Sequence, residues 1–181
     1  MPVPDSAIVK WPDVPACYGW LSLDRRGNWR LKGEQVRHGG LIAFINRHYG
    51  ADQHGNWIFQ NGPQAVFVSL DYTPLVLRMD SSERLLAHTG APPGDIAAAY
   101  LDEEGSVLLH TAAGIGLLDD RDLASFIGAC RDDSGNAAQD EALQDVMAGG
   151  SGVSWRGLQL RAIRRAEVAL RFGFRPDPAA G

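Results

Sequence analysis

Hydrophobic and polar positions alternate in several short stretches of the chain, and this alternation predicts β-strands. Side chains alternate from Tyr18 to Leu23, and a second strand-like run follows at residues 28–32. A period of two residues sends successive side chains to opposite faces of a sheet. The remaining strand-like runs lie at residues 57–60, 65–70, 75–79, 96–101, 107–110, 153–160 and 168–172.

Other stretches have the spacing of amphipathic helices. The first helix has one apolar stripe, formed by Leu41, Ile42, Phe44, Ile45 and Tyr49. Gly50 is expected to cap its C-terminal end. The second helix has apolar residues at i, i+3, i+4 and i+7, namely Leu123, Phe126, Ile127 and Cys130. The acidic residues Asp119, Asp120 and Asp122 are expected to cap its start. A further helix is predicted at residues 137–147.

One six-residue pattern, Asp-x-x-Gly followed after one residue by an aromatic or β-branched residue, occurs three times. The copies span residues 24–29, 52–57 and 102–107. Aspartate at the start of a turn accepts a hydrogen bond from the amide two residues later. Glycine three residues after it tolerates the positive φ that a type I turn with a bulge requires. Each copy therefore predicts a tight reversal that leads into a strand.

The order of these elements predicts an α+β fold with two related units. Residues 41–45 and 123–127 match in register, and we also align residues 75–79 with residues 168–172. Each unit is mainly antiparallel strands with one packed helix, and the second unit contains an extra helix. Chance agreement between common hairpins and common helices is the alternative. The expected segments are a lead-in (1–17), a ββαβββ unit (18–79), a linker (80–95), a second unit (96–174) with the inserted helix (137–147), and a disordered tail (175–181).

Composition and charge narrow the class of protein. The chain has 181 residues, of which 45% are hydrophobic and 22% charged, as is typical of soluble globular proteins. No apolar run is long enough to span a membrane, and the first residues do not resemble a signal peptide, so a cytoplasmic location is expected. Cys17 and Cys130 have no partners at metal-ligand spacing and are expected to be buried thiols.

Arginine is concentrated at the C-terminal end of the chain. The segment from Arg156 onward has six arginines against Glu167 and Asp177, whereas the whole chain has a formal net charge of −5. One interpretation is an anion-binding or nucleic-acid-binding surface. The favoured one is a basic segment that docks on the acidic body of the same chain. The candidate anion-binding residues are Arg156, Arg161, Arg164 and Arg165.

Several sequence runs resemble an uncharacterised bacterial family of unknown function. They are Cys-Tyr-Gly-Trp-Leu (17–21), Phe-Ile-Asn-Arg-His-Tyr (44–49), Gly-Asn-Trp-Ile-Phe-Gln-Asn-Gly-Pro-Gln (55–64), Tyr-Thr-Pro (72–74), His-Thr-Gly (88–90) and Arg-Phe-Gly-Phe (171–174). The layout is also similar to another unknown-function family that is built of repeated αβ motifs. These resemblances imply an α+β fold with two related units and, for the second family, a role in signalling. They imply no catalytic residue.

The side chains that usually carry chemistry form no recognisable motif. None of the five histidines makes an i, i+4 pair with another, so neither a metal site nor a cofactor is predicted. The serines lack a nucleophile elbow, and neither cysteine has an activating base nearby in sequence. An enzyme with dispersed acid–base residues, namely His48, His54 and one aspartate, is an alternative hypothesis.

The most distinctive polar stretch lies between Trp57 and Gln64. Gln60, Asn61 and Gln64 place three amides beside the Gly62-Pro63 corner, and Trp57 or Phe59 offers a flat apolar wall. Amides donate and accept hydrogen bonds, so a small ligand with mixed polar groups could sit at this corner, but the favoured interpretation is that the amides hold the turn. The duplication, this polar loop and the lack of a nucleophile motif or metal site favour a small-ligand-binding or regulatory (signalling) module, and exposed strand edges are compatible with a homodimer.

Overall fold

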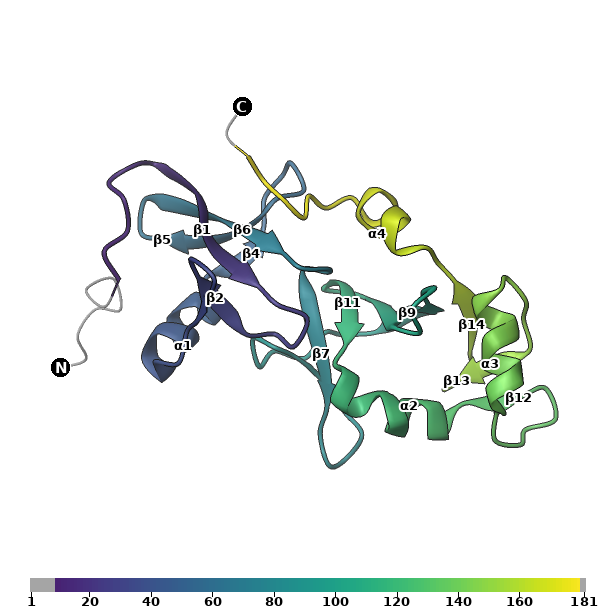
Figure 1. Cartoon of the computed structure of the whole chain (residues 1–181). Coiled ribbons are helices and arrows are strands. Elements are labelled where there is room, and N and C mark those ends of the chain that lie inside the picture. The colour runs from purple at the N-terminus through teal and green to yellow at the C-terminus, as the bar shows by residue number, and fades with distance from the viewer. Residues whose placement is uncertain (1–8, 180–181) are drawn as a thin grey trace.

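The first β-sheet is built from strands of the N-terminal half of the chain. The computed structural model describes residues 9–179 (Figure 1). The strand order is β3-β2-β1-β6-β5-β4, with the central pair β1 and β6 parallel and the other pairs antiparallel. The strands are β1 (Ala16–Leu23), β2 (Trp29–Leu31), β3 (Glu34–Gln35), β4 (Tyr49–Ala51), β5 (Trp57–Asn61) and β6 (Gln64–Leu70).

The second sheet is larger and uses the rest of the chain. Its order is β12-β13-β14-β9-β10-β11-β7-β8, with β14 parallel to β9 and β7 parallel to β11. The strands are β7 (Leu75–Met79), β8 (Leu85–Ala87), β9 (Ile96–Leu101), β10 (Val107–Thr111), β11 (Gly114–Leu118), β12 (Arg131–Asp132), β13 (Val153–Trp155) and β14 (Leu158–Ala162).

Six strands of each sheet are connected in the same way. In the first sheet β1 pairs with β2 and with β6, and β6 leads through β5 to the edge strand β4. In the second sheet β9 pairs with β10 and with β14, and β14 leads through β13 to β12. In both sets the first strand along the chain is parallel to the last, β1 to β6 and β9 to β14. The fold is therefore α+β, as predicted.

The helices lie between these strands. α1 (Gly39–Arg47) begins at His38, whose Nδ1 accepts a hydrogen bond from the Leu41 amide at 3.1 Å. The short 3-10 helix η2 (Asp120–Asp122) follows Asp119, whose carboxylate accepts from the Arg121 amide. Of the three predicted acidic caps only Asp119 forms one, because Asp122, the N-cap of α2 (Leu123–Ala129), makes no side-chain cap hydrogen bond. The other helices are α3 (Asp140–Met147) and α4 (Arg165–Phe172). Figure 1 shows α2 along one side of the second sheet and α3 beside β13 and β14.

Two apolar clusters fill the space around the second sheet. One joins the inner face of the first sheet, including Leu21 and Val68, to Leu108 and Leu117 of the second. The other packs the opposite face of the second sheet against α2 and α3, where Phe126 stacks on Trp155 at 4.8 Å. The central strands β9, β10 and β11 of the second sheet are covered on both faces and are accordingly mostly apolar runs.

The Asp-x-x-Gly turns form as predicted, and the structure adds two more of the same kind. In each turn one carboxylate oxygen accepts hydrogen bonds from the amides two and four residues later, at 2.8 to 3.0 Å. The fourth residue has positive φ, and in one turn it is Glu83 with φ 61° in place of glycine. The turns span residues 24–28, 52–56, 80–84, 102–106 and 132–136.

The prediction of a strand at residues 168–172 is wrong. These residues belong to α4, which ends at Gly173 with a left-handed conformation at φ 68°. A segment of only five residues, most of them apolar, fits the period of a helix as well as that of a strand. The pattern alone therefore did not separate the two. Residues 75–79 form a strand, and the proposed match between these two segments is therefore wrong as well.

Other predicted boundaries also change. α1 ends at Arg47, and Gly50 lies in strand β4 instead of capping the helix. β7, predicted as part of the first unit, pairs with β11 of the second sheet, and the predicted linker contains β8. The tail is ordered as far as it is described, because the Leu70 amide donates to the Pro176 carbonyl at 2.7 Å. Residues 1–8 and 180–181 lie outside the described residues.

Candidate functional site

A pocket of about 390 Å³ lies where the two sheets meet. Its walls come from the α1–β4–β5 region, from β7 and β8, and from the loop that follows β8. We call it the junction pocket. The residues that matter for its chemistry are Asn46, Tyr49, Trp57, Thr89, Pro92 and Pro93.

Two aromatic rings form one wall of the junction pocket. Trp57 is the first residue of β5 and follows the turn at residues 52–56 directly. Its ring centroid lies 5.1 Å from that of Tyr49, and the Tyr49 hydroxyl donates a 2.6 Å hydrogen bond to the Pro74 carbonyl. Burial holds the pKa of Tyr49 well above its ordinary value, so this side chain stays a neutral donor. The wall is therefore fixed in place.

The polar groups of the junction pocket are few and uncharged. The Asn46 side-chain oxygen accepts a 2.7 Å hydrogen bond from the Trp29 indole, and its NH₂ group has no acceptor among the described residues. The Thr89 hydroxyl oxygen accepts from the Ala91 amide at 3.4 Å. Hence an amide and a hydroxyl remain able to donate to a bound molecule.

A partly buried histidine lies behind the aromatic wall. His88 Nδ1 accepts a hydrogen bond from the Val76 amide at 3.2 Å, and its ring contacts Trp29 and Tyr49 at centroid distances of 5.3 and 5.5 Å. Nε2 is buried and has no partner among the described residues. Burial lowers the pKa of His88 to about 4, outweighing the hydrogen bond from Val76. The ring is thus neutral at physiological pH.

The four candidate residues of the Trp57–Gln64 stretch do not meet at one site. Trp57 lines the junction pocket, whereas Asn61 and Gln64 line a separate hollow of about 480 Å³ beside Trp11. Gln60 Nε2 donates to the carbonyls of Gly62 and Gln64, at 2.7 and 3.1 Å.

The Gln64 and Asn61 amides are also engaged. Gln64 Nε2 donates to the carbonyls of Pro12 and Val14, both at 2.7 Å, and Asn61 Nδ2 donates to the Gln64 side chain at 3.2 Å. These bonds hold the hairpin and tie the lead-in segment to it.

The candidate arginines are spread over several surroundings. Arg156 stacks on Trp155 at 4.4 Å and donates to the Glu83 carbonyl. Arg165 lies 3.5 Å from Glu104 and donates to the Asp71 carbonyl at 3.1 Å. The Arg161 and Arg164 residues are exposed. Two of the four are therefore engaged by the rest of the chain.

The histidines of the acid–base hypothesis occupy a helix end and a turn. His48 caps the C-terminal end of α1 and its ring contacts Phe44 at 4.9 Å. His54 is exposed in the turn at residues 52–56. Neither lines the junction pocket. Within residues 9–179, no group of three or more histidine, cysteine or acidic residues could hold a metal ion.

Sequence reasoning missed most of the junction pocket. Tyr49 was assigned to a helix stripe, and Pro92 and Pro93 only to a linker. No pattern in the sequence marks Asn46 as a pocket residue, because its position follows from the way α1 leads into β4. The Gly/Pro-rich linker was the available clue, since loops at the junction of two units are common ligand sites.

Residues 3–179 match the model of a family described as "Protein of unknown function (DUF2946)". The chain belongs to this family. The resemblance to an uncharacterised family is thus confirmed, and no specific function comes with it. No curated protein matches the chain.

Two solved structures resemble the fold. A DUF1285 family protein from Silicibacter pomeroyi DSS-3 superposes with a TM-score of 0.52 at 12% identity, over 84% of this chain and 88% of that chain. A DUF1285 family protein from Shewanella baltica OS155 gives a TM-score of 0.45 at 14% identity, over 60% and 91%. The first likeness shows the fold alone. No helix within the described residues has the length and apolar character needed to cross a membrane.

Proposed function

We propose that this protein is a small-ligand-binding module, and that its ligand is a neutral planar ring with a hydrogen-bond acceptor. The observation that carries the proposal is an aromatic wall, Tyr49 and Trp57, beside the spare NH₂ group of Asn46 in the junction pocket. Ligand pockets generally combine apolar walls with a few polar groups that fix orientation. The pocket volume of about 390 Å³ lies in the usual range of roughly 300–1,000 Å³.

The absence of charge in the lining supports a neutral ligand. None of the residues that line the junction pocket is acidic or basic. An ionised ligand would lose its hydration there without gaining a counter-charge, which is strongly unfavourable. A flat ring could stack on Trp57 and contact Pro92 and Pro93, while Asn46 donates to its acceptor atom.

A regulatory role is part of this proposal. The lining combines residues of the first sheet, such as Trp57, with residues of the second, such as Leu75 and Ala87. A ligand that binds only the assembled arrangement stabilises it by mass action. Binding would therefore stabilise the arrangement of the two sheets, and this change in stability could be transmitted to a partner protein.

We also infer that the two sheets arose by internal duplication. Supporting observations are the shared strand connection, the place of α1 and α2 before the edge strands β4 and β12, and their contacts with β5 and Trp155 of β13. In this view the junction pocket lies mainly between the first copy and the connecting segment that contains β7, β8 and the loop after β8.

The proposal is tested by screening neutral bicyclic heteroaromatic compounds with ligand-observed NMR. We expect hits whose affinity falls about tenfold in Trp57→Leu, because the stacking surface is lost. Asn46→Ala should weaken compounds that carry an acceptor and leave pure hydrocarbons unchanged. Trp20→Leu is the matched control, since Trp20 is a partly exposed tryptophan outside the pocket. Hits that bind Trp57→Leu as tightly as the unaltered protein would disprove the proposed site.

A further inference from the structure

A second cavity, of about 420 Å³, lies between two of the Asp-x-x-Gly turns. The turn at residues 24–28 contributes Arg25 and Arg26, and the turn at residues 102–106 contributes Glu104 and Ser106. We call this cavity the arginine cleft. It shares no lining residue with the junction pocket.

Arg25 is the central cation of the arginine cleft. Its guanidinium group lies 5.1 Å from the centroid of the Tyr72 ring, and its Nη2 donates to the Ser106 hydroxyl oxygen at 2.8 Å. No carboxylate oxygen of the described residues lies within 4.0 Å of it. The Tyr72 ring and the Ser106 hydroxyl hold the Arg25 guanidinium group, whose other N–H groups have no carboxylate partner among the described residues and can donate to a ligand.

The ring beneath Arg25 is itself held firmly. The Tyr72 hydroxyl donates a 2.8 Å hydrogen bond to Asp102, which is fully buried. The Arg165 guanidinium also lies 4.8 Å from the Tyr72 ring. Burial and the hydrogen bond to Asp102 raise the pKa of Tyr72 far above its ordinary value, so the ring remains a neutral platform.

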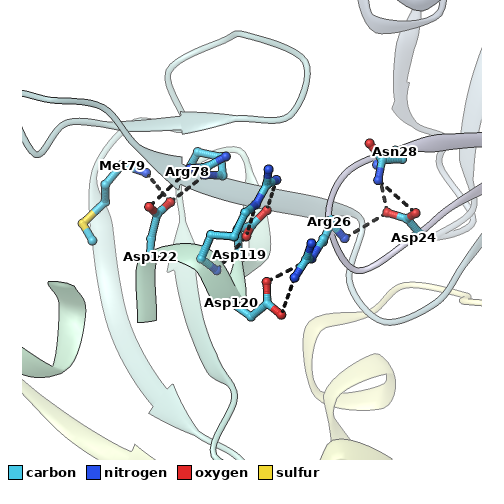
Figure 2. A network of polar contacts seen from close by, with 9 residues as sticks. Asp24, Arg26, Asn28, Arg78, Met79, Asp119, Asp120 and Asp122 are labelled. Carbon is cyan, nitrogen blue, oxygen red and sulfur yellow. Dashed lines mark hydrogen bonds and ion pairs between the residues drawn. The ribbon is translucent and has the colours of Figure 1, made fainter. Parts of the chain in front are cut away.

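The other charges around the cleft are already paired. Figure 2 shows Arg26 facing Asp120, with two contacts of 3.1 Å across the two sheets. Glu104 lies 3.5 Å from Arg165. After these pairings one positive charge, that of Arg25, is left without a partner at the cavity.

Apolar side chains complete the cleft. Leu118 is buried at the end of β11, on the face of the second sheet that packs against α2, and Leu123 begins α2. A ligand that fits must therefore combine one negative charge with an apolar part. A dianion such as phosphate would face Glu104 and Asp120 with only one cation to balance it.

We propose that the arginine cleft binds a monocarboxylate with a short apolar chain. The carboxylate pairs with the edge of the Arg25 guanidinium and accepts from the Ser106 hydroxyl, which has no acceptor of its own among the described residues. The chain lies against Leu118 and Leu123, which belong to the same apolar cluster. Because the ligand contacts turns of both sheets, it would strengthen the contact that Arg26 and Asp120 make at the surface.

Hexanoate titrated into the ¹⁵N-labelled full chain tests this site by NMR. We expect saturable shifts at the amides of Ser106, Leu117 and Leu118, and affinity about tenfold weaker in Arg25→Gln. Arg156→Gln is the matched control, because Arg156 also stacks on an aromatic ring and donates to a neutral oxygen, away from the cleft. Ser106→Ala keeps the Arg25–Tyr72 stack and should weaken binding about threefold.

Three results would overturn the proposal. Equal hexanoate affinity in Arg25→Gln and Arg156→Gln would show that Arg25 does not hold the carboxylate. Hexanol binding as tightly as hexanoate would show that charge has no role. Inorganic phosphate binding more tightly than hexanoate would show that the site selects dianions instead. Should Arg25→Gln fail to fold, unchanged hexanoate affinity in Ser106→Ala would show that the carboxylate does not bind at the Arg25–Ser106 pair.

Discussion

The turns at residues 52–56 and 132–136 have the same local structure in different surroundings. Each aspartate accepts hydrogen bonds from the amides two and four residues later, and the glycines have φ of 84° and 83°. A Cβ at Gly55 would lie 2.6 Å from the Gly173 carbonyl oxygen, whereas a Cβ at Gly135 would have no atom within 4 Å. Local chemistry thus forms the turn, and the tertiary contacts decide how much a change to it costs.

The remaining turns extend this comparison. Gly27 packs on the partly buried His88, since a Cβ there would lie 2.6 Å from His88 Cβ. Asp102 is fully buried beneath Tyr72, whereas Asp132 is partly exposed. Turns with equivalent sequences therefore range from surface loops to parts of the core.

Removing the turn aspartate should have its largest effect at Asp102. Asp102→Ala leaves the Tyr72 hydroxyl and two turn amides without acceptors, and we expect a loss of about 4 kcal/mol in the free energy of unfolding. Asp132→Ala removes only solvent-accessible bonds and should cost about 1 kcal/mol. Urea denaturation of both variants measures the difference.

Asp102→Asn serves as the control for this pair. Its side-chain oxygen can still accept from the amides of Glu104 and Ser106, and its NH₂ group can donate to the Tyr72 oxygen. It should keep most of the stability. Equal losses in Asp102→Ala and Asp132→Ala would show that burial of the turn does not matter.

The turn at residues 24–28 covers a titratable group, which makes stability depend on pH. The pKa of His88 is about 4 in the folded protein, below its ordinary value of 6.5. The unfolded chain therefore binds the proton first. Stability is complete above pH 6.5 and falls between pH 6.5 and 4, by about 3 kcal/mol from this group.

Unfolding midpoints at pH 7, 5.5 and 4.5 check this prediction. His88→Asn keeps an acceptor for the Val76 amide and removes the titrating ring, so its stability should change less over this range. Parallel pH profiles of the two proteins would contradict the assignment to His88.

The two glycines of the opening comparison should differ by about 2 kcal/mol. Gly135→Ala introduces only the strain of a positive φ, about 1 kcal/mol. Gly55→Ala adds a clash with the backbone of Gly173, and we expect about 3 kcal/mol in total. Thermal and urea unfolding of the two variants measure this difference. Equal losses in the free energy of unfolding would mean that the C-terminal segment around Gly173 moves away from the new Cβ without destabilising the fold.

Much of the fold was predictable, and most of the candidate site was not. The helices near residues 41 and 123 and the three predicted turns followed from spacing and from Asp and Gly chemistry. The junction pocket depends on contacts between segments far apart in the chain, such as Tyr49 with Pro74. Of its lining residues only Trp57 was a candidate, because an aromatic residue at a strand start is visible in the sequence.

The arginine cleft shows the same division. Arg25 and Ser106 lie in turns that the sequence predicts, yet they are 81 residues apart and meet only when the two sheets pack. Nothing in either turn indicates that the other one faces it.

By itself the sequence determined the reversals, the helical stripes and the α+β class, since these depend on the preferences of a few neighbouring residues. The tertiary structure alone decided that β7 joins the second sheet, that residues 165–172 are helical, and which side chains share a pocket. Strand partners and pockets depend on the total apolar surface that distant segments bury together, and a local pattern does not contain that information.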